Sequence, residues 1–237
     1  MTWESSLRDS GEALDAEELA VVSGCVEKRR REFSASRRCA RAALARLGTT
    51  GFPLLPGRDR APIWPRGVVG SITHTDGGPD GYCAVAVARR GLTAGLGIDA
   101  EPRLSLPVEL WPRVLDAREL HDARSAAEPG ILARLIFSAK ETTYKALYPI
   151  FKQFLDFSDL HIDTQPEQGI FLARLVGRIA DRYGWRHGLT GRFLVDRELI
   201  VTAMAIPPRG LPLAPEEPLP PHVPLWDRTR EASHESR

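Results

Sequence analysis

A helical pattern followed by strand-like segments occurs twice along this 237-residue chain, and this repetition restricts the fold more than any other feature. In the first set, helically spaced apolar residues end at Gly48 and are followed by apolar, alternating segments. The second set begins with helical patterns and also ends in strand-like runs, the last with a hairpin turn at residues 196–198. Strand-like segments lie at residues 68–73, 82–88, 96–101, 169–176 and 189–206, and helical patterns at residues 28–46, 108–127 and 131–147. The pattern predicts an α+β fold of two halves, each of about 100 residues.

Prolines mark the expected ends of the two halves. Pro102 and Pro107 interrupt the chain after the first set of strands, so we predict an N-terminal half at residues 1–103 and a C-terminal half at residues 104–206. Residues 207–237 contain eight of the nineteen prolines. Because this composition cannot bury enough apolar surface to offset the cost of ordering, we predict an extended or disordered tail there.

Charge, cysteine content and hydropathy exclude several classes of protein. Lysine and arginine number 32 against 31 acidic residues, and this net charge of +1 gives no electrostatic reason to expect a nucleic-acid partner. The three cysteines form no CxxC pair, which fits a reducing cytosol better than a disulfide framework or a structural zinc site. Neither a leader pattern nor a membrane-spanning apolar run is present. We expect a soluble, cytoplasmic, monomeric protein without a membrane partner.

Positive charge is concentrated in the first helical pattern. Between Lys28 and Arg46 there are eight basic residues and one acid, Glu32. The spacing predicts an amphipathic helix with an arginine-rich exposed face. Such a face is either a solvated surface or an anion-binding site.

Two acidic clusters suggest a divalent cation. Asp99 and Glu101 are two apart in a strand-like segment, so their carboxylates point to one side, where they either bind a hard cation such as Mg²⁺ or Mn²⁺ or form a solvated edge. Glu141 and Lys145 are four apart on a predicted helix. They form either an ordinary salt bridge or a third carboxylate with a lysine beside it for phosphate.

A third cluster is suited to an anion. His74 lies at the end of a strand-like segment between Thr73 and Thr75, followed by Gly77 and Gly78. The imidazole and the hydroxyls can donate hydrogen bonds to a phosphate, and the glycines allow close approach to the backbone.

Taken together, these clusters resemble one family, the Sfp-type 4'-phosphopantetheinyl transferases, and especially the branch of enterobactin synthetase component D. The resemblance covers about residues 15–205. The similar segments are REFSASRRCAR at 31–41, WPRGVVGSITHT at 64–75, GIDAEP at 97–102 and FSAKETTYKA at 137–146.

The resemblance implies two similar α+β halves related by a pseudo-twofold axis, with the active site in the cleft between them. It also implies transfer of the 4'-phosphopantetheine arm of coenzyme A to a serine of an apo carrier protein, with Mg²⁺ as cofactor and adenosine 3',5'-bisphosphate as by-product. Asp99, Glu101 and Glu141 would hold the metal. The residues that would contact coenzyme A are Arg31, Arg37, Arg60, Thr73, His74, Lys140 and Lys145. The carriers would belong to polyketide, nonribosomal peptide or fatty-acid synthases.

Within this hypothesis Lys145 would offset the charge that develops on the leaving phosphate. The proton of the carrier serine would pass to Glu141 or to a metal-bound water assisted by it. Residues 108–124, with Trp111 and two arginines, are a candidate docking surface for the carrier. Two alternatives are a metal-dependent nuclease, because the same acids could cleave phosphodiesters, and an inactive carrier-binding module.

Overall fold

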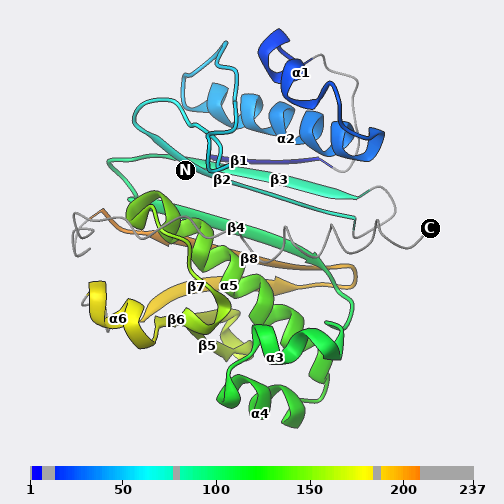
Figure 1. The fold of residues 1–237 in the computed structure, drawn as a ribbon, viewed down its shortest axis with the longest axis vertical. Helices are drawn as coiled ribbons and strands as arrows, with labels where there is room; N and C mark the ends of the chain where they lie inside the picture. Colours follow the sequence, from blue (N-terminus) through cyan, green and yellow to red (C-terminus); the bar gives the residue numbers. More distant parts are fainter. Residues whose placement is uncertain (1, 7–13, 77–80, 184–187, 209–237) are drawn as a thin grey trace.

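The first of two antiparallel sheets has three strands and is covered by a long helix. This computed structural model describes residues 2–6, 14–76, 81–183 and 188–208. The strand order is β1-β3-β2, with β1 at Thr2–Ser6, β2 at Val68–Thr75 and β3 at Tyr82–Arg89. Helix α2, Glu27–Arg46, packs against this sheet (Figure 1). Its buried side chains, among them Cys39 and Leu44, form the first core with residues of β2 and β3.

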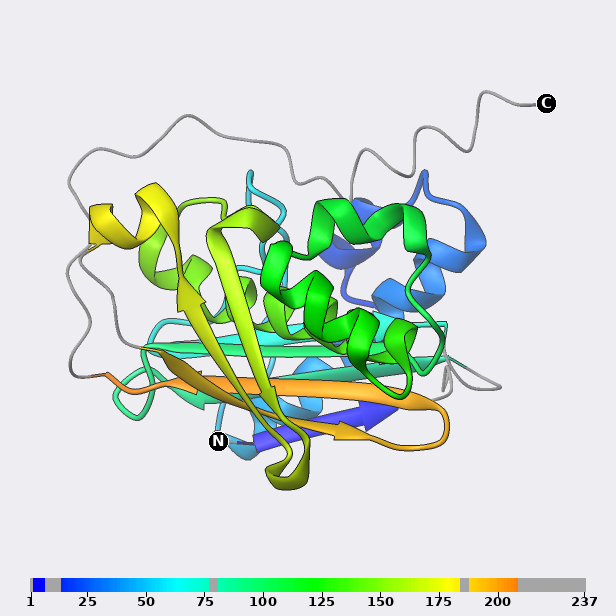
Figure 2. The ribbon, with the colours of Figure 1, turned by 90° about the horizontal axis from the view of Figure 1, so that it is seen from below.

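The second sheet has five strands in the order β4-β8-β7-β6-β5. The strands are β4 at Gly95–Pro102, β5 at Leu160–Gln165, β6 at Ile170–Leu175, β7 at Leu189–Val195 and β8 at Leu199–Ile206. Helix α5, Pro129–Phe151, packs on β4 and β8, and it lies with α4, Ala117–Ser125, on one face of the sheet (Figure 2). The larger core lies between α5 and the sheet.

Shorter elements complete the described chain. They are α1 (Ala16–Val22), η1 (Val108–Leu110), α3 (Trp111–Val114), η2 (Phe157–Asp159), η3 (Pro166–Gln168) and α6 (Gly177–Tyr183). The helical pattern predicted at residues 108–127 is interrupted, because Leu115 is extended and Asp116 caps α4 by accepting hydrogen bonds from the N–H groups of Arg118 and Glu119.

The predicted α+β class is confirmed, and the hairpin turning at residues 196–198 connects β7 to β8. Strand β4 is hydrogen-bonded to β8 and therefore belongs to the sheet of the second half. The predicted boundary at residue 103 instead places β4 in the first half. Strands β1 and β5 were not predicted. Most of the predicted tail, from residue 209 onward, lies outside the described residues.

Strands β2 and β4 are the facing edges of the two sheets, and hydroxyl groups connect them. The Ser71 hydroxyl accepts a hydrogen bond from the N–H of Ile98 at 3.0 Å, and the Thr73 hydroxyl accepts one from the N–H of Ala100 at 3.0 Å. These side chains satisfy backbone donors that would otherwise be unpaired at a sheet edge. The junction between the halves is therefore a polar, ordered seam.

Two glycines allow β4 to lie directly on α5. A Cβ atom added to Gly95 would be 2.0 Å from the carbonyl oxygen of Ala146, and one added to Gly97 would be 2.0 Å from that of Thr142. Asp99 follows on the same face of the strand. The glycines thus bring the Asp99 side chain within reach of α5. Along the described part of the chain, no helix combines the length and apolar character that a bilayer crossing needs.

This close packing predicts a large effect for Gly97→Ala. The added methyl group meets backbone rather than a movable side chain, so β4 and α5 must separate, and we expect a loss of about 1 to 3 kcal/mol in the free energy of unfolding. Gly91→Ala is the matched control, because a Cβ atom there meets nothing within 4 Å. Urea denaturation of the two variants measures the difference. Equal stabilities would contradict the proposed contact.

Candidate active site

Asp99 lies at the seam and is bonded to side chains from both halves. Its side chain is almost fully buried, and Oδ1 accepts hydrogen bonds from the Thr73 hydroxyl at 3.2 Å and from Nζ of Lys145 at 2.6 Å. Oδ2 accepts a hydrogen bond from the Ser138 hydroxyl at 2.8 Å. Thr73 comes from β2, whereas Ser138 and Lys145 come from α5. The hydroxyl partners were not identified from the sequence as ligands of Asp99.

Glu101 is the second carboxylate of this strand face. Its Oε2 forms an ion pair with Arg134 of α5 at 2.9 Å. Burial, together with the negative charge of Asp99, raises the pKa of Glu101 to about 7, although Arg134 opposes the shift. The carboxyl group is thus in an environment that disfavours additional negative charge and favours a nearby cation.

Glu141 is the third carboxylate. Its contacts show whether Glu141 and Lys145 form an ordinary salt bridge or a carboxylate with a separate lysine beside it. Lys145 pairs with Asp99, and within the described ranges the Glu141 carboxylate takes part in no hydrogen bond or ion pair. Burial raises the pKa of Glu141 to about 7. The charge of Lys145 opposes this shift and that of Asp99 adds to it. The ordinary i,i+4 salt bridge is therefore not formed.

Lys145 supplies the positive charge of the cluster. Burial acts to lower the pKa of Lys145, but the charges of Asp99, Glu141 and Glu101 outweigh it, so the pKa is raised. The ammonium group remains charged at neutral pH. Its hydrogen bond to Asp99 and a longer contact with the carbonyl of Ile98 at 3.4 Å hold it at the seam.

The three carboxylates have the donor chemistry of a magnesium site. All donors are oxygens, and one of the three, Glu141, has no protein partner. Their oxygens do not all come within 4.8 Å of one another, because the one group of described residues meeting that distance is a different one. Lys145 and Arg134 each hold one carboxylate. The three carboxylates are suitable ligands for a divalent cation, but their oxygens lie farther apart than the sequence-based prediction of a common metal site requires.

Lys140, predicted to contact coenzyme A, is instead enclosed in the protein. The side chain is 1% exposed, and its ammonium group donates to the carbonyls of Val114 at 2.8 Å and Phe157 at 3.0 Å and to Oε2 of Glu119 at 2.7 Å. These contacts use all three donors of the ammonium group, so none is available for a phosphate. This corrects the expectation for Lys140: its role is structural.

Arg37 and Thr73 also direct their polar groups inward. Arg37 is buried, donates from Nε to the carbonyl of Leu54 at 2.9 Å, and lies over the Phe33 ring at 3.6 Å. Burial lowers the pKa of Arg37 to about 10. The Thr73 hydroxyl is occupied by Asp99 and by the N–H of Ala100. The described contacts thus give both side chains structural partners, and their contact with coenzyme A stays a prediction.

His74 lies beside the first turns of α2. Its Nε2 is 3.5 Å from NH1 of Arg29 and 4.0 Å from Oε2 of Glu32. Arg31 and Arg60 are exposed. The structure therefore brings together His74 and the basic start of α2, two features far apart in the sequence, while Arg37 of the same helix faces the core.

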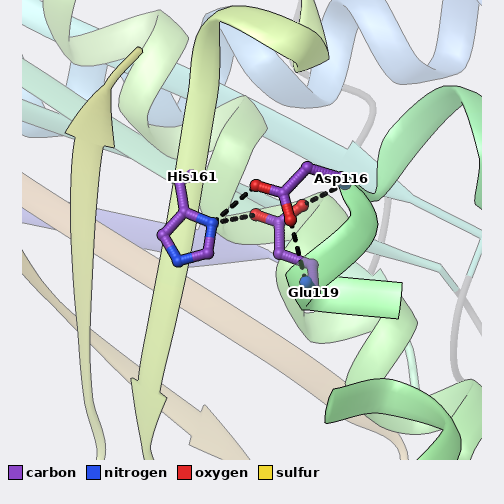
Figure 3. Close-up of side chains that lie close together, drawn as sticks. All are labelled: Asp116, Glu119 and His161. Carbon is purple, nitrogen blue, oxygen red and sulfur yellow. Dashed lines mark hydrogen bonds and ion pairs between the residues drawn. The ribbon is translucent and has the colours of Figure 1, made fainter. Parts of the chain in front are cut away.

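A second polar cluster, missed from the sequence, joins α4, α5 and β5. Nδ1 of His161 is 2.6 Å from Oδ2 of Asp116 and 3.9 Å from Oε1 of Glu119 (Figure 3). These atoms lie close enough for a metal ion, yet protein donors already occupy them: Glu119 accepts hydrogen bonds from the N–H groups of Asp116 and Ile162 and from Lys140. The cluster is explained as a structural network. No single motif marks it, because its members are distant in the sequence.

The candidate docking surface also needs correction at Trp111. The Trp111 ring is 7% exposed, and its Nε1 donates to the carbonyl of Leu106 at 3.0 Å. Trp111 therefore belongs to the core of the second half. Leu104 and Val108 of the same half are exposed apolar side chains.

Comparisons with known proteins identify the family of the chain. Residues 16–88 match the 4'-phosphopantetheinyl transferase N-terminal domain, and residues 95–202 match the 4'-phosphopantetheinyl transferase superfamily. The chain is 44% identical to 4'-phosphopantetheinyl transferase Svp of Streptomyces mobaraensis, over 80% of this chain and 77% of that protein. It is 39% identical to 4'-phosphopantetheinyl transferase PptT of Mycobacterium tuberculosis, over 80% and 85%.

Enterobactin synthase component D of Salmonella typhi is 37% identical, over 50% of this chain and 48% of that protein. The chain belongs to the 4'-phosphopantetheinyl transferase family and is an enzyme of that family. The family resemblance seen in the sequence, including its branch, is confirmed.

Proposed function

We propose that this enzyme transfers the 4'-phosphopantetheine arm of coenzyme A to a serine of an apo carrier protein, with Mg²⁺ as cofactor and adenosine 3',5'-bisphosphate as by-product. The observation that carries the proposal is the grouping of Asp99, Glu101, Glu141 and Lys145 at the seam between the two sheets. The names of the relatives support the same activity. The carriers are domains of polyketide, nonribosomal peptide or fatty-acid synthases.

Asp99, Glu101 and Glu141 would hold the Mg²⁺, which when bound neutralises pyrophosphate charge and stabilises the transition state. Lys145 has a raised pKa and is anchored at 2.6 Å to Asp99, so it presents a fixed positive charge at the seam. We assign to Lys145 the stabilisation of charge on the leaving phosphate oxygen, a role suited to a compact ammonium group.

Glu141 is our candidate acceptor for the proton of the carrier serine. Its carboxylate has no described protein partner that would occupy the oxygens, so an oxygen that does not bind the cation can accept a proton. As the serine oxygen bonds to phosphorus, its proton would pass to a carboxylate oxygen of Glu141, directly or through one water.

Binding of coenzyme A is assigned to the surface where His74 meets α2. His74, Arg29 and Arg31 lie at or near this meeting point, and Arg60 is exposed on the loop before β2. Imidazole and guanidinium groups donate hydrogen bonds to phosphate oxygens. We also propose a cytoplasmic monomer: one chain supplies all the site residues, and the free cysteines suit a reducing compartment.

The test uses the wild-type enzyme, Mg²⁺, coenzyme A with a fluorescent group on its thiol, and an apo carrier protein. We expect covalent fluorescence on the carrier that is lost with EDTA and lost when the carrier serine is replaced by alanine. Mass spectrometry should show adenosine 3',5'-bisphosphate in equal amount. Absence of label on several apo carriers, with Mg²⁺-dependent cleavage of DNA, would favour the nuclease instead.

A further inference from the structure

Three buried hydroxyl groups form a continuous chain that ends at Asp99. Oγ1 of Thr142 is 2.6 Å from Oγ1 of Thr202, which is 2.9 Å from Oγ of Ser138, and Ser138 is 2.8 Å from Oδ2 of Asp99. All three hydroxyl residues are 0% exposed. Thr202 on β8 is also the cross-strand partner of Asp99 on β4, so the strand register places both beside Ser138.

The acceptor at the end of the chain sets the direction of the Ser138 proton. An ionised carboxylate cannot donate, so the single proton of Ser138 goes to Asp99. The Thr202 hydroxyl lies 2.9 Å from the Ser138 hydroxyl and can donate to it or to the Ser138 carbonyl at 3.1 Å. The Thr142 hydroxyl can likewise donate to the Thr202 hydroxyl at 2.6 Å or to the Thr202 carbonyl at 3.3 Å. The Ser138 hydroxyl therefore points toward Oδ2, and the Thr202 and Thr142 hydroxyls lie in series behind it.

The other carboxylate oxygen is fixed from the opposite half. Because the Thr73 hydroxyl accepts from the N–H of Ala100, its proton is directed to Oδ1 of Asp99, which also accepts from Lys145. A carboxylate offers about four acceptor positions. Three are filled by these side chains, and hydrogen bonds to both oxygens prevent rotation of the group.

We propose that Ser138 and Thr202 are positioning residues, which lock the Asp99 carboxylate so that its one remaining acceptor position is available to a divalent cation. The assignment rests on the proposed function, since that function places the cation beside Asp99. The same face of α5 carries Ser138 and Thr142, and β4 lies close against it at Gly97, where an added Cβ would be 2.0 Å from the Thr142 carbonyl oxygen.

Direct binding of Mn²⁺ tests the proposal without reference to turnover. The probe is Mn²⁺ titrated into full-length protein with saturating coenzyme A, followed by electron paramagnetic resonance. Ser138→Ala removes the donor to Oδ2, and we expect Mn²⁺ affinity to fall by about 10- to 100-fold, as for other partners of metal ligands. Thr202→Val, which keeps the side-chain shape and does not touch the carboxylate, should cause a smaller loss in the same direction.

Thr143→Val is the matched control. Thr143 is equally buried on the same helix, but its hydroxyl bonds only to the carbonyl of Ala139 at 2.7 Å. Its Mn²⁺ affinity should equal that of the wild type, and circular dichroism melts without metal should show all three variants folded. If Ser138→Ala does not fold, the Mn²⁺ affinities of Thr202→Val and Thr143→Val test the proposal. A loss in Thr202→Val alone supports it, and equal affinities contradict it.

Mn²⁺ binding by Ser138→Ala equal to that of the wild type, or an equal loss in Thr143→Val, would overturn the proposal, as would a wild type that binds no Mn²⁺. A wild type whose Mn²⁺ affinity depends on Ser138 but that transfers no label to any carrier would instead contradict the proposed function and leave the positioning role unchanged.

Discussion

Replacement of Lys140 by methionine is expected to lower the free energy of unfolding by about 3 to 5 kcal/mol, the effect usual when one partner of a buried ion pair is removed. Glu119, the partner of Lys140, is 1% exposed and would be left buried without the ammonium group that balances its charge. The carbonyls of Val114 and Phe157 would lose their donor as well. Urea denaturation followed by circular dichroism measures the loss.

Two further variants separate the ion pair from general effects of the substitution. Lys152→Met changes an exposed lysine at the end of the same helix and should have little effect. Adding Glu119→Gln to Lys140→Met removes the unpaired charge, so the double variant should be more stable than the sum of the single losses implies. Strictly additive losses, or a stable Lys140→Met protein, would show that the pair does not hold α4 to α5.

Elements with strong internal patterns were predictable from the sequence. The spacing of apolar residues located α2 and α5, and alternation located β2, β3 and the hairpin of β7 and β8. Strand β1 has the sequence TWESS, which carries no such pattern, and its pairing with β3 creates the strand. Periodicity at residues 108–127 could not show that Asp116 caps a new helix in the middle of the pattern.

In the site, too, residues related by local spacing could be predicted from the sequence, whereas contacts between distant segments could not. Asp99, Glu101, Glu141 and Lys145 could be chosen because i,i+2 spacing on a strand and i,i+4 spacing on a helix restrict where side chains point. Both Lys140 and Lys145 were predicted to contact coenzyme A, yet Lys140 is enclosed by Glu119 and two carbonyls while Lys145 pairs with Asp99. The packing of α3, α4 and η2 around Lys140, and of β4 beside Lys145, places the two ammonium groups differently.

Glu141→Gln is expected to lower kcat for phosphopantetheine transfer by about 10²- to 10⁴-fold, the range of general acid–base catalysis. Glutamine keeps the size of the side chain and one ligating oxygen but cannot take the proton of the carrier serine. In the structure the Glu141 carboxylate has no protein partner and a pKa raised to about 7 by burial, so the change breaks no described hydrogen bond. Steady-state transfer of fluorescent coenzyme A to an apo carrier measures kcat and KM.

Glu167→Gln, an exposed glutamate of the same half, is the control and should retain wild-type rates. Measuring Mn²⁺ affinity in the same Glu141→Gln protein separates the two assigned roles. A fall in kcat with Mn²⁺ affinity retained identifies proton transfer as the main contribution of Glu141, whereas parallel falls identify metal binding. Transfer within about tenfold of the wild-type rate would be too small a loss for a general base and would remove Glu141 from that role, leaving the proton to another acceptor at the seam.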